Sequence, residues 1–251
     1  MTNIELFSLE GKKALVTGAS RGLGRAIAIA LAHAGAHVIC SSSQDGGTDD
    51  TIALIEENGG SAEGMACDLS DSTAILALAE KCNDVDILVN NGGTIERFPA
   101  VDFPEESWNH VIQVNQNATF MLCQKLGKNM IDRGYGKIIN IASMLSYTGG
   151  ITVPAYTASK HAVVGITKAL TNEWAQHNVQ VNAIAPGYFK TDNTQALQDD
   201  ASRNAEITKR IPAARWGEPS DLGGAAVFLA SQASNYINGA VLPVDGGWLA
   251  R

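Results

Sequence analysis

Short apolar runs, rich in β-branched residues, alternate with longer amphipathic segments along most of this sequence. The apolar runs lie at 13–18, 37–41, 62–68, 86–91, 136–143, 179–186 and 240–245. The runs LVTG, ILVNN and IINIAS are continuous rather than alternating, which is typical of strands that are covered on both faces. We therefore predict an α/β fold of the Rossmann type, a doubly wound sheet of seven parallel strands with helices on both faces.

No proline- or serine-rich linker interrupts this alternation, so we expect residues 1–251 to form a single domain, with a long helix over 106–131. Between 188 and 217 the chain carries an insertion with little apolar periodicity. Ligands of an open parallel sheet bind beyond the carboxyl ends of its strands, so an insertion leaving this edge is well placed to act as a lid. A solvated helical hairpin without a gating role is the alternative.

Charge and composition limit the classes of partner. The net charge is −8 and the pI about 5.1, whereas nucleic-acid and membrane-surface proteins need a clustered basic face. No run approaches the roughly 18 apolar residues of a membrane span, and MTNIELFSLEGKK lacks the regions of a secretory signal. The four cysteines have no C-x-x-C spacing and the five histidines form no ligand set. We expect free thiols, no metal and a cytoplasmic protein.

The octapeptide TGASRGLG, residues 17–24, joins the first strand directly to the first helix. Gly18 permits a sharp turn, Gly22 leaves room at the helix start, and Gly24 lets the helix pack closely on the strand. The free N–H groups at the helix N-terminus would then face a pyrophosphate. A glycine triplet alone also occurs in other tight turns, but in this position it predicts a dinucleotide site.

Tyr156 and Lys160 lie four residues apart at the start of an apolar-periodic segment, and Ser143 ends the run KIINIAS. On a helix, residues i and i+4 lie on one face about 5–6 Å apart. We therefore expect the Lys160 ammonium to lower the pKa of Tyr156 from its reference value near 10. Such a phenol could exchange a proton with a substrate oxygen that Ser143 polarises. Taken singly, these residues would be an ordinary solvated pair and a strand-end cap.

The spacing G-x-x-x-G-x-G, the pair Tyr156-x-x-x-Lys160 and NNGG at 90–93 together resemble the short-chain dehydrogenase/reductase family, over nearly the whole chain. The resemblance implies catalysis by Ser143, Tyr156 and Lys160, with Lys160 also binding the nicotinamide ribose and Asn115 holding a water in a proton relay. Gly92 stands where the family usually has alanine, and we expect a slightly looser turn there. We assign coenzyme contacts to Gly18, Ser20, Arg21, Gly22, Leu23, Gly24 and Ser41. The resemblance adds Asp68, Leu69, Asn91, Gly92, Lys160, Pro186, Gly187 and Thr191.

The end of the second strand bears on the choice between NAD and NADP. An acid there usually binds the ribose 2′-hydroxyl of NAD, but this strand ends in Ser41, Ser42 and Ser43, and Asp45 comes later. Arg21 in the glycine turn offers a guanidinium that could pair with a 2′-phosphate. These residues favour NADP(H) over NAD(H). An Arg21–Asp45 pair with loose specificity is the alternative.

We assign substrate contacts to Arg97, Tyr147, Tyr188 and Arg215, on a pocket edge that is polar and has few aromatics. A small hydroxylated keto acid suits such an edge better than a long acyl chain, which needs a broad apolar lining. The segments 143–160, 178–188 and 236–251 resemble the 2-deoxy-D-gluconate 3-dehydrogenase and 2-dehydro-3-deoxy-D-gluconate 5-dehydrogenase subgroup, many members of which use NAD.

That resemblance implies an NAD(P)-dependent oxidoreductase that moves hydride between a nicotinamide and a keto- or hydroxy-deoxy sugar acid, as in pectin and alginate breakdown. The substrate could be 2-keto-3-deoxygluconate or a 4-deoxy-uronate keto acid. A 3-oxoacyl-carrier-protein reductase or another small-carbonyl reductase is one alternative, although an acidic carrier would need a basic docking patch. A non-catalytic dinucleotide-binding regulator is another, although such proteins usually lose the tyrosine or the lysine.

The resemblance also implies a homotetramer. The helix around 161–177 and the segment 240–251 carry apolar residues that pack between subunits in this family. A monomer that buries these residues internally is the alternative.

Overall fold

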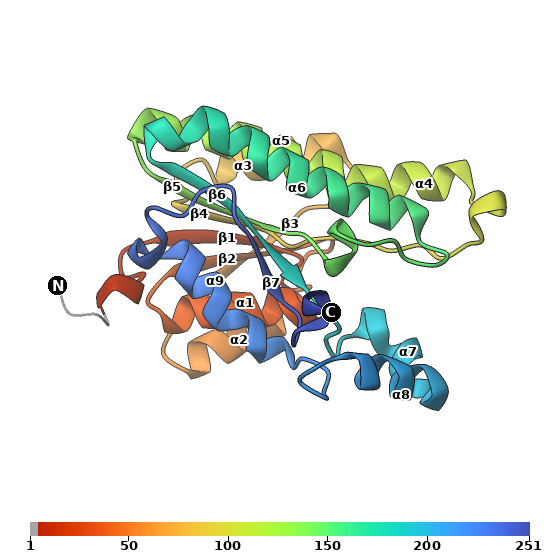
Figure 1. Cartoon of the computed structure of the whole chain (residues 1–251). Helices are drawn as coiled ribbons and strands as arrows, with labels where there is room; N and C mark the ends of the chain where they lie inside the picture. The colour runs from red at the N-terminus through yellow and green to blue at the C-terminus, as the bar shows by residue number, and fades with distance from the viewer. Residues whose placement is uncertain (1–4) are drawn as a thin grey trace.

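Seven parallel strands form one sheet in the order β3-β2-β1-β4-β5-β6-β7 in the computed structural model, which describes residues 5–251 (Figure 1). The strands are β1 (Lys13–Thr17), β2 (His37–Ser42), β3 (Ser61–Ala66), β4 (Ile87–Asn90), β5 (Gly136–Ile141), β6 (Val179–Pro186) and β7 (Val241–Val244). The chain builds β2 and β3 on one side of β1 and then crosses to β4 on the other side. This reversal creates the switch point at which open α/β sheets bind ligands. The predicted Rossmann-type sheet is confirmed.

Helices cover both faces of the sheet (Figure 1). One layer contains α1 (Gly22–His33), α2 (Asp49–Glu57) and α9 (Gly223–Ala230). The opposite layer contains α3 (Ser72–Lys81), α4 (Glu105–Ile112), α5 (Ala118–Arg133) and α6 (Pro154–Trp174). None of the helices in residues 5–251 is both long enough and apolar enough to span a membrane.

The central strands are continuously apolar because each supplies side chains to two cores. In β1, Ala14 and Val16 join the core that contains Ile27 of α1, whereas Leu15 joins the core that contains Leu122 of α5. All three β1 side chains are completely buried. The edge strand β3 is mostly exposed by comparison. Burial on both faces thus accounts for the pattern from which the sheet was predicted.

The long helix expected over 106–131 is divided in the structure. A π-helical turn, Gln113–Asn117, separates α4 from α5. Such turns insert one extra residue into a helix and are frequent at functional sites. Asn115 lies within this turn and is buried.

The insertion between β6 and α9 contains two short helices, α7 (Gln195–Asp199) and α8 (Ala201–Arg210), which project from the carboxyl end of the sheet (Figure 1). Ile207 and Ile211 anchor α8 in a small core with Met144, Trp216 and Trp248. The insertion therefore lies at the edge where a lid was expected. Its closure over a ligand stays a prediction.

Candidate active site

A cavity of about 510 Å³ opens beside the glycine turn, at the carboxyl ends of β1, β2 and β4. It brings together most of the residues that we assigned to the coenzyme. Gly18, Ser20, Arg21, Gly22, Leu23, Gly24, Ser41, Asp68, Leu69, Asn91, Gly92, Lys160 and Thr191 all line it. Gly187 lines a neighbouring cavity instead, and Pro186, the last residue of β6, lines neither.

The glycine turn is packed too tightly for side chains at two positions. Gly18 has a φ of +64°, and a Cβ on it would lie 2.9 Å from the Cα of Gly92. A Cβ on Gly24 would lie only 2.1 Å from the carbonyl oxygen of Gly18. Both glycines are therefore needed to fold the turn back against α1 and β4.

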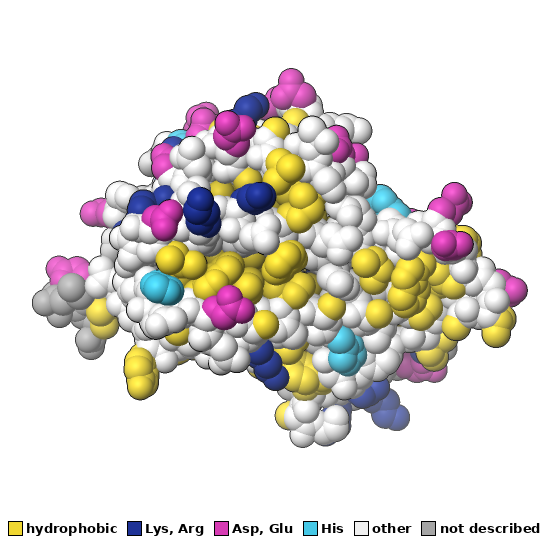
Figure 2. Space-filling model, turned by 90° about the horizontal axis from the view of Figure 1, so that it is seen from above, with side chains coloured by type: hydrophobic (Ala, Val, Ile, Leu, Met, Phe, Trp, Pro, Cys, Tyr) yellow, Lys and Arg dark blue, Asp and Glu magenta, His cyan; other side chains and the backbone are white. Residues whose placement is uncertain are grey.

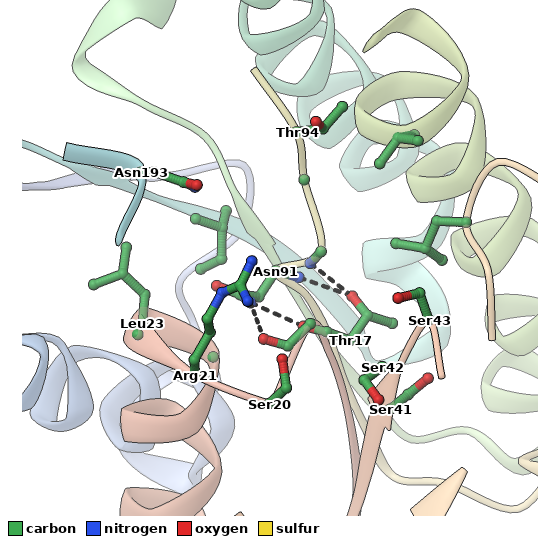
Figure 3. A pocket seen from close by; sticks show the side chains of 18 of the residues that line it. Thr17, Ser20, Arg21, Leu23, Ser41, Ser42, Ser43, Asn91, Thr94 and Asn193 are labelled. Carbon is green, nitrogen blue, oxygen red and sulfur yellow. Dashed lines mark hydrogen bonds between the residues drawn. The ribbon is translucent and has the colours of Figure 1, made fainter. Parts of the chain in front are cut away.

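Asn91 fastens the turn to the end of β4. Its Nδ2 donates to the carbonyl oxygens of Thr17 and Gly18 at 2.9 and 3.1 Å. The Thr17 hydroxyl in turn accepts from the N–H groups of Asn91 and Gly92 at 3.1 and 2.9 Å, and Figure 3 shows these bonds at the base of the cavity. Since Gly92 is tied in this way, the slightly looser turn that we expected there is not supported.

One wall of the cavity is formed by Asp68 and Leu69. The Asp68 carboxylate accepts from the N–H and the hydroxyl of Ser70, both at 2.8 Å, and these bonds lower its pKa. Leu69 extends over Gly92, where an added Cβ would come within 2.3 Å of the Leu69 Cδ1 atom. The glycine that replaces the usual alanine therefore makes room for Leu69 at this wall.

Ser41, Ser42 and Ser43 lie together at the end of β2 and line the cavity (Figure 3). Ser41 is buried, and the Ser42 hydroxyl donates to the carbonyl oxygen of Gln44 at 2.9 Å. Arg21 does not pair with Asp45, as the alternative supposed. Its Nε lies 3.1 Å from Oδ2 of Asp192, at the start of the insertion.

These residues fit a dinucleotide. No side chain caps the first turn of α1, so its N–H groups are available to a phosphate. The cavity wall is rich in hydroxyl, amide and glycine residues, and Arg21 adds a positive charge at its edge. Among residues 5–251, no three His, Cys, Asp or Glu side chains stand close enough to share a metal ion. The four cysteines are free and buried, as predicted.

A second cavity, of about 750 Å³, adjoins the first, and Tyr156 lines both. Ser143 lines the second cavity and Lys160 the first, so the three residues meet where the two cavities join. The Lys160 Nζ donates to the carbonyl oxygen of Ile141 at 2.6 Å and lies 5.6 Å from the centre of the Tyr156 ring. The sheet and α6 thus bring the predicted catalytic group together.

The expected lowering of the Tyr156 pKa is wrong for the protein alone. Burial raises the pKa of Tyr156, and the opposing effects of the Ser143 side chain and of the Arg97 charge are smaller. Burial also lowers the pKa of Lys160 to about 8, so the ammonium loses its proton at a lower pH than an exposed lysine does. The spacing of four residues predicts that the two groups lie close together. It does not predict that both are buried, and burial is what shifts the two pKa values here.

Asn115 connects the π-helical turn to the active site. Its Oδ1 accepts from the N–H of Thr94 at 2.8 Å, and its Nδ2 donates to the Thr94 carbonyl oxygen and to the Ser159 hydroxyl at 3.0 and 3.1 Å. Its own carbonyl oxygen accepts from the Thr119 hydroxyl at 2.8 Å. Asn115 therefore joins α6 to the segment after β4. The water that we expected it to hold stays a prediction.

Two of the four assigned substrate residues line the second cavity, namely Arg97 and Tyr188. Tyr147 does not, because its hydroxyl turns to the carbonyl oxygen of Val241, at 3.4 Å. Arg215 does not either, because its guanidinium forms a two-pronged ion pair with Asp221, at 2.6 and 3.2 Å. Both residues lie in or next to segments that we predicted to form the site, but their polar groups bind partners outside the cavity.

The sequence reasoning missed three charged residues on α8, Arg203, Glu206 and Arg210, which line the second cavity together with Trp248. Their spacing of three and four residues places them on one face of a helix. This spacing was the available signal. It was overlooked because the insertion has little apolar periodicity.

Comparison with known proteins gives three kinds of match. A family model described as Enoyl-(Acyl carrier protein) reductase matches residues 18–249. The chain is 55% identical over 250 residues to 2-dehydro-3-deoxy-D-gluconate 5-dehydrogenase of Bacillus subtilis, with 98% of both chains covered. A crystal structure from Agrobacterium tumefaciens with bound NADP is 52% identical, with a TM-score of 0.94 and full coverage of both chains. A gluconate 5-dehydrogenase of Burkholderia cenocepacia in complex with NADP and tartrate is 37% identical, with a TM-score of 0.95 and full coverage of both.

Proposed function

Because the chain belongs to the short-chain dehydrogenase/reductase family, as its motifs predicted, we propose that it is an NAD(P)-dependent oxidoreductase of keto- and hydroxy-deoxy sugar acids. The reaction class is that of 2-dehydro-3-deoxy-D-gluconate 5-dehydrogenase, the name carried by relatives that are 49 to 55% identical. The observation that carries the proposal is the position of Tyr156, which borders the first cavity, where the coenzyme would bind, and the second cavity at once.

The residues of the chain would divide the chemistry as follows. When bound, the nicotinamide supplies or accepts the hydride. Ser143, buried at the end of β5, is placed to donate a hydrogen bond to the reacting oxygen of the substrate. Tyr156 would give this oxygen a proton during reduction and take it back during oxidation. Its raised pKa keeps the phenol protonated at neutral pH, which is the form that reduction needs.

Lys160 would hold the ribose of the nicotinamide. Its Nζ is fixed by the carbonyl oxygen of Ile141 and is almost completely buried, so its remaining donors have a defined direction. An ammonium in that place also stabilises the phenolate that forms when Tyr156 gives up its proton. The pKa of about 8 leaves Lys160 largely charged at neutral pH and discharges it in mildly alkaline solution.

We propose NADP(H) as the preferred coenzyme. Arg21 stands at the edge of the cavity and three serines take the place of the acid that would repel a 2′-phosphate. Solved structures that are 52 and 37% identical to this chain hold NADP. Asp68 and Leu69 would contact the adenine, and the first turn of α1 would bind the pyrophosphate.

We further propose a homotetramer in the cytoplasm. Large exposed hydrophobic side chains lie on the layer that contains α6, among them Leu76 of α3, Trp108 of α4 and Phe120 of α5. Figure 2 looks onto this layer and shows hydrophobic side chains gathered along it. The four free thiols fit a reducing compartment. Light scattering of the purified protein would give a mass of four chains; a mass of one chain would refute the assembly.

One assay tests the activity. The purified protein is mixed with NADPH or NADH and with 2-keto-3-deoxygluconate, an open-chain 4-deoxy-uronate keto acid, an acetoacetyl thioester, or no substrate, and the coenzyme absorbance is followed. We expect turnover with a sugar acid, faster with NADPH. Turnover of the thioester alone would favour a carrier-protein reductase, and turnover of nothing would favour a regulator.

A further inference from the structure

Three cations face the second cavity, which we call the substrate cavity from here on, and they differ in their partners. Arg97 donates from Nη2 to the carbonyl oxygen of Asn193 at 3.3 Å. Arg203 pairs with Glu206, with Nη1 2.8 Å from Oε2. Arg210 forms no ion pair or side-chain hydrogen bond with any other residue of the described part of the chain. Its guanidinium N–H groups are therefore available to a ligand.

The structure nevertheless fixes the position of Arg210. Its guanidinium lies 3.9 Å from the centre of the Trp248 ring. Trp248 is buried and packs edge-on against Tyr188, with ring centres 4.8 Å apart. The carbonyl oxygen of Arg210 accepts from Nε and Nη2 of Arg251 at 3.1 and 2.9 Å. A guanidinium that lies over an aromatic ring can still donate from the N–H groups along its edge. Two of these groups can form parallel hydrogen bonds to one carboxylate.

The cations also stand at different ends of the cavity. The charge of Arg97 acts on Tyr156, where its effect is to lower the phenol pKa. The charges of Arg203 and Arg210 act in the same sense on Tyr188. Arg97 also donates to Asn193, which lines both cavities, so it belongs to the reacting end. Arg210 lies over Trp248, so the α8 arginines belong to the end closed by Tyr188 and Trp248. In a sugar acid that reacts at its fifth carbon, the carboxylate and the reacting carbon lie toward opposite ends of the molecule.

We propose that Arg210, stacked on Trp248 and facing the cavity from α8, binds the carboxylate of the substrate. This inference rests on the proposed function, and it assigns the carboxylate to a residue outside the four that we assigned to the substrate from the sequence. Arg203 neutralises Glu206, so the nearby carboxylate does not repel the substrate, and Glu206 remains able to accept from a substrate hydroxyl. The insertion would therefore select anionic sugars, while the catalytic group selects only a carbonyl or alcohol.

The test compares an acid with a neutral analogue. Arg210→Gln is assayed with 2-keto-3-deoxygluconate and with its methyl ester. We expect KM for the acid to rise about 10- to 100-fold, the loss of one hydrogen-bonded charge pair, with KM for the ester changed less than about threefold. Lys209→Gln is the matched control, because Lys209 is the preceding cation of α8 but does not line the cavity. It should leave both KM values unchanged.

Arg210→Lys keeps the charge but loses the two-pronged edge, so it should raise KM for the acid by an intermediate factor. It also serves as the second variant if Arg210→Gln does not fold. The assignment would be overturned if Arg210→Gln raised KM for the acid and for the ester equally. It would also be overturned if Arg203→Gln, but not Arg210→Gln, raised KM for the acid selectively. In both cases turnover by the wild type would still support the proposed function. A wild type that turns over neither sugar acid would remove the proposed function and this inference with it.

Discussion

Replacing Gly24 by alanine is the smallest substitution that should disrupt the coenzyme cavity. The added Cβ would lie 2.1 Å from the carbonyl oxygen of Gly18 and 2.4 Å from Nδ2 of Asn91. Neither atom is free to move away. The carbonyl oxygen belongs to the backbone of the turn, and Nδ2 holds the turn through its bonds to Thr17 and Gly18.

The expected cost follows from these contacts. Forcing an extra carbon into a packed region costs about 1–3 kcal/mol, and each Asn91 hydrogen bond that breaks adds about 0.5–1.5 kcal/mol. Alanine recovers up to about 1 kcal/mol because it is a better helix former than glycine. We expect Gly24→Ala to lower the free energy of unfolding by about 1–3 kcal/mol. It should also weaken NADPH binding by at least about tenfold, because the first turn of α1 is displaced from the phosphates.

Urea unfolding at a fixed protein concentration measures the first effect, and a fluorescence titration with NADPH measures the second. Gly224→Ala is the control, because Gly224 is the second residue of α9 and a Cβ there meets no atom within 4 Å. That variant should be neutral or about 0.5–1 kcal/mol more stable. If Gly24→Ala keeps wild-type stability and coenzyme affinity, the argument from close packing is refuted.

Three further predictions concern single side chains. Tyr156→Phe should lower kcat by about 10²- to 10⁴-fold with coenzyme affinity unchanged; turnover at the wild-type rate would exclude proton transfer by this phenol. Arg21→Gln should raise KM for NADPH about 10- to 100-fold and alter KM for NADH less than about threefold, since a charge-assisted bond to the 2′-phosphate serves only NADPH; equal changes would contradict this role. Lys137, buried in β5 beside Ser234 and Asn235, has a pKa lowered to about 8 by burial, below its unfolded value of 10.5. Between these values the unfolded state binds more protons, so Lys137 makes the folded protein more stable as pH rises. The free energy of unfolding of Lys137→Met minus that of the wild type should therefore fall across this window, and a constant difference would rule the effect out.

The sequence predicts the sheet well because its pattern reports burial directly. Strands such as β1 and β5 are buried on both faces, and every residue of β5 is buried. The glycine turn was also predictable, because part of its spacing follows from a local contact: a Cβ on Gly24 would meet the carbonyl oxygen of Gly18, six residues earlier. The π-helical turn at Gln113–Asn117 was not, because its residues continue the helical pattern on either side.

The substrate cavity shows where sequence reasoning fails. Arg215 and Arg210 both lie in or next to the insertion, and nothing in their immediate neighbours tells them apart. Arg215 meets Asp221 at the start of the next helical segment, whereas Arg210 meets Trp248, which lies 38 positions later in the chain. The prediction of a lowered Tyr156 pKa was wrong for a similar reason, because desolvation depends on the whole surrounding fold.

The insertion contacts both cavities with one continuous stretch of chain. Thr191, Asp192 and Asn193 line the coenzyme cavity, and Asn193, Thr194 and Leu197 line the substrate cavity. Any shift of this stretch that one ligand favours must alter the affinity for the other, and thermodynamic linkage makes the two factors identical. A saturating coenzyme should therefore tighten or loosen sugar-acid binding by the same ratio that a saturating sugar acid imposes on the coenzyme.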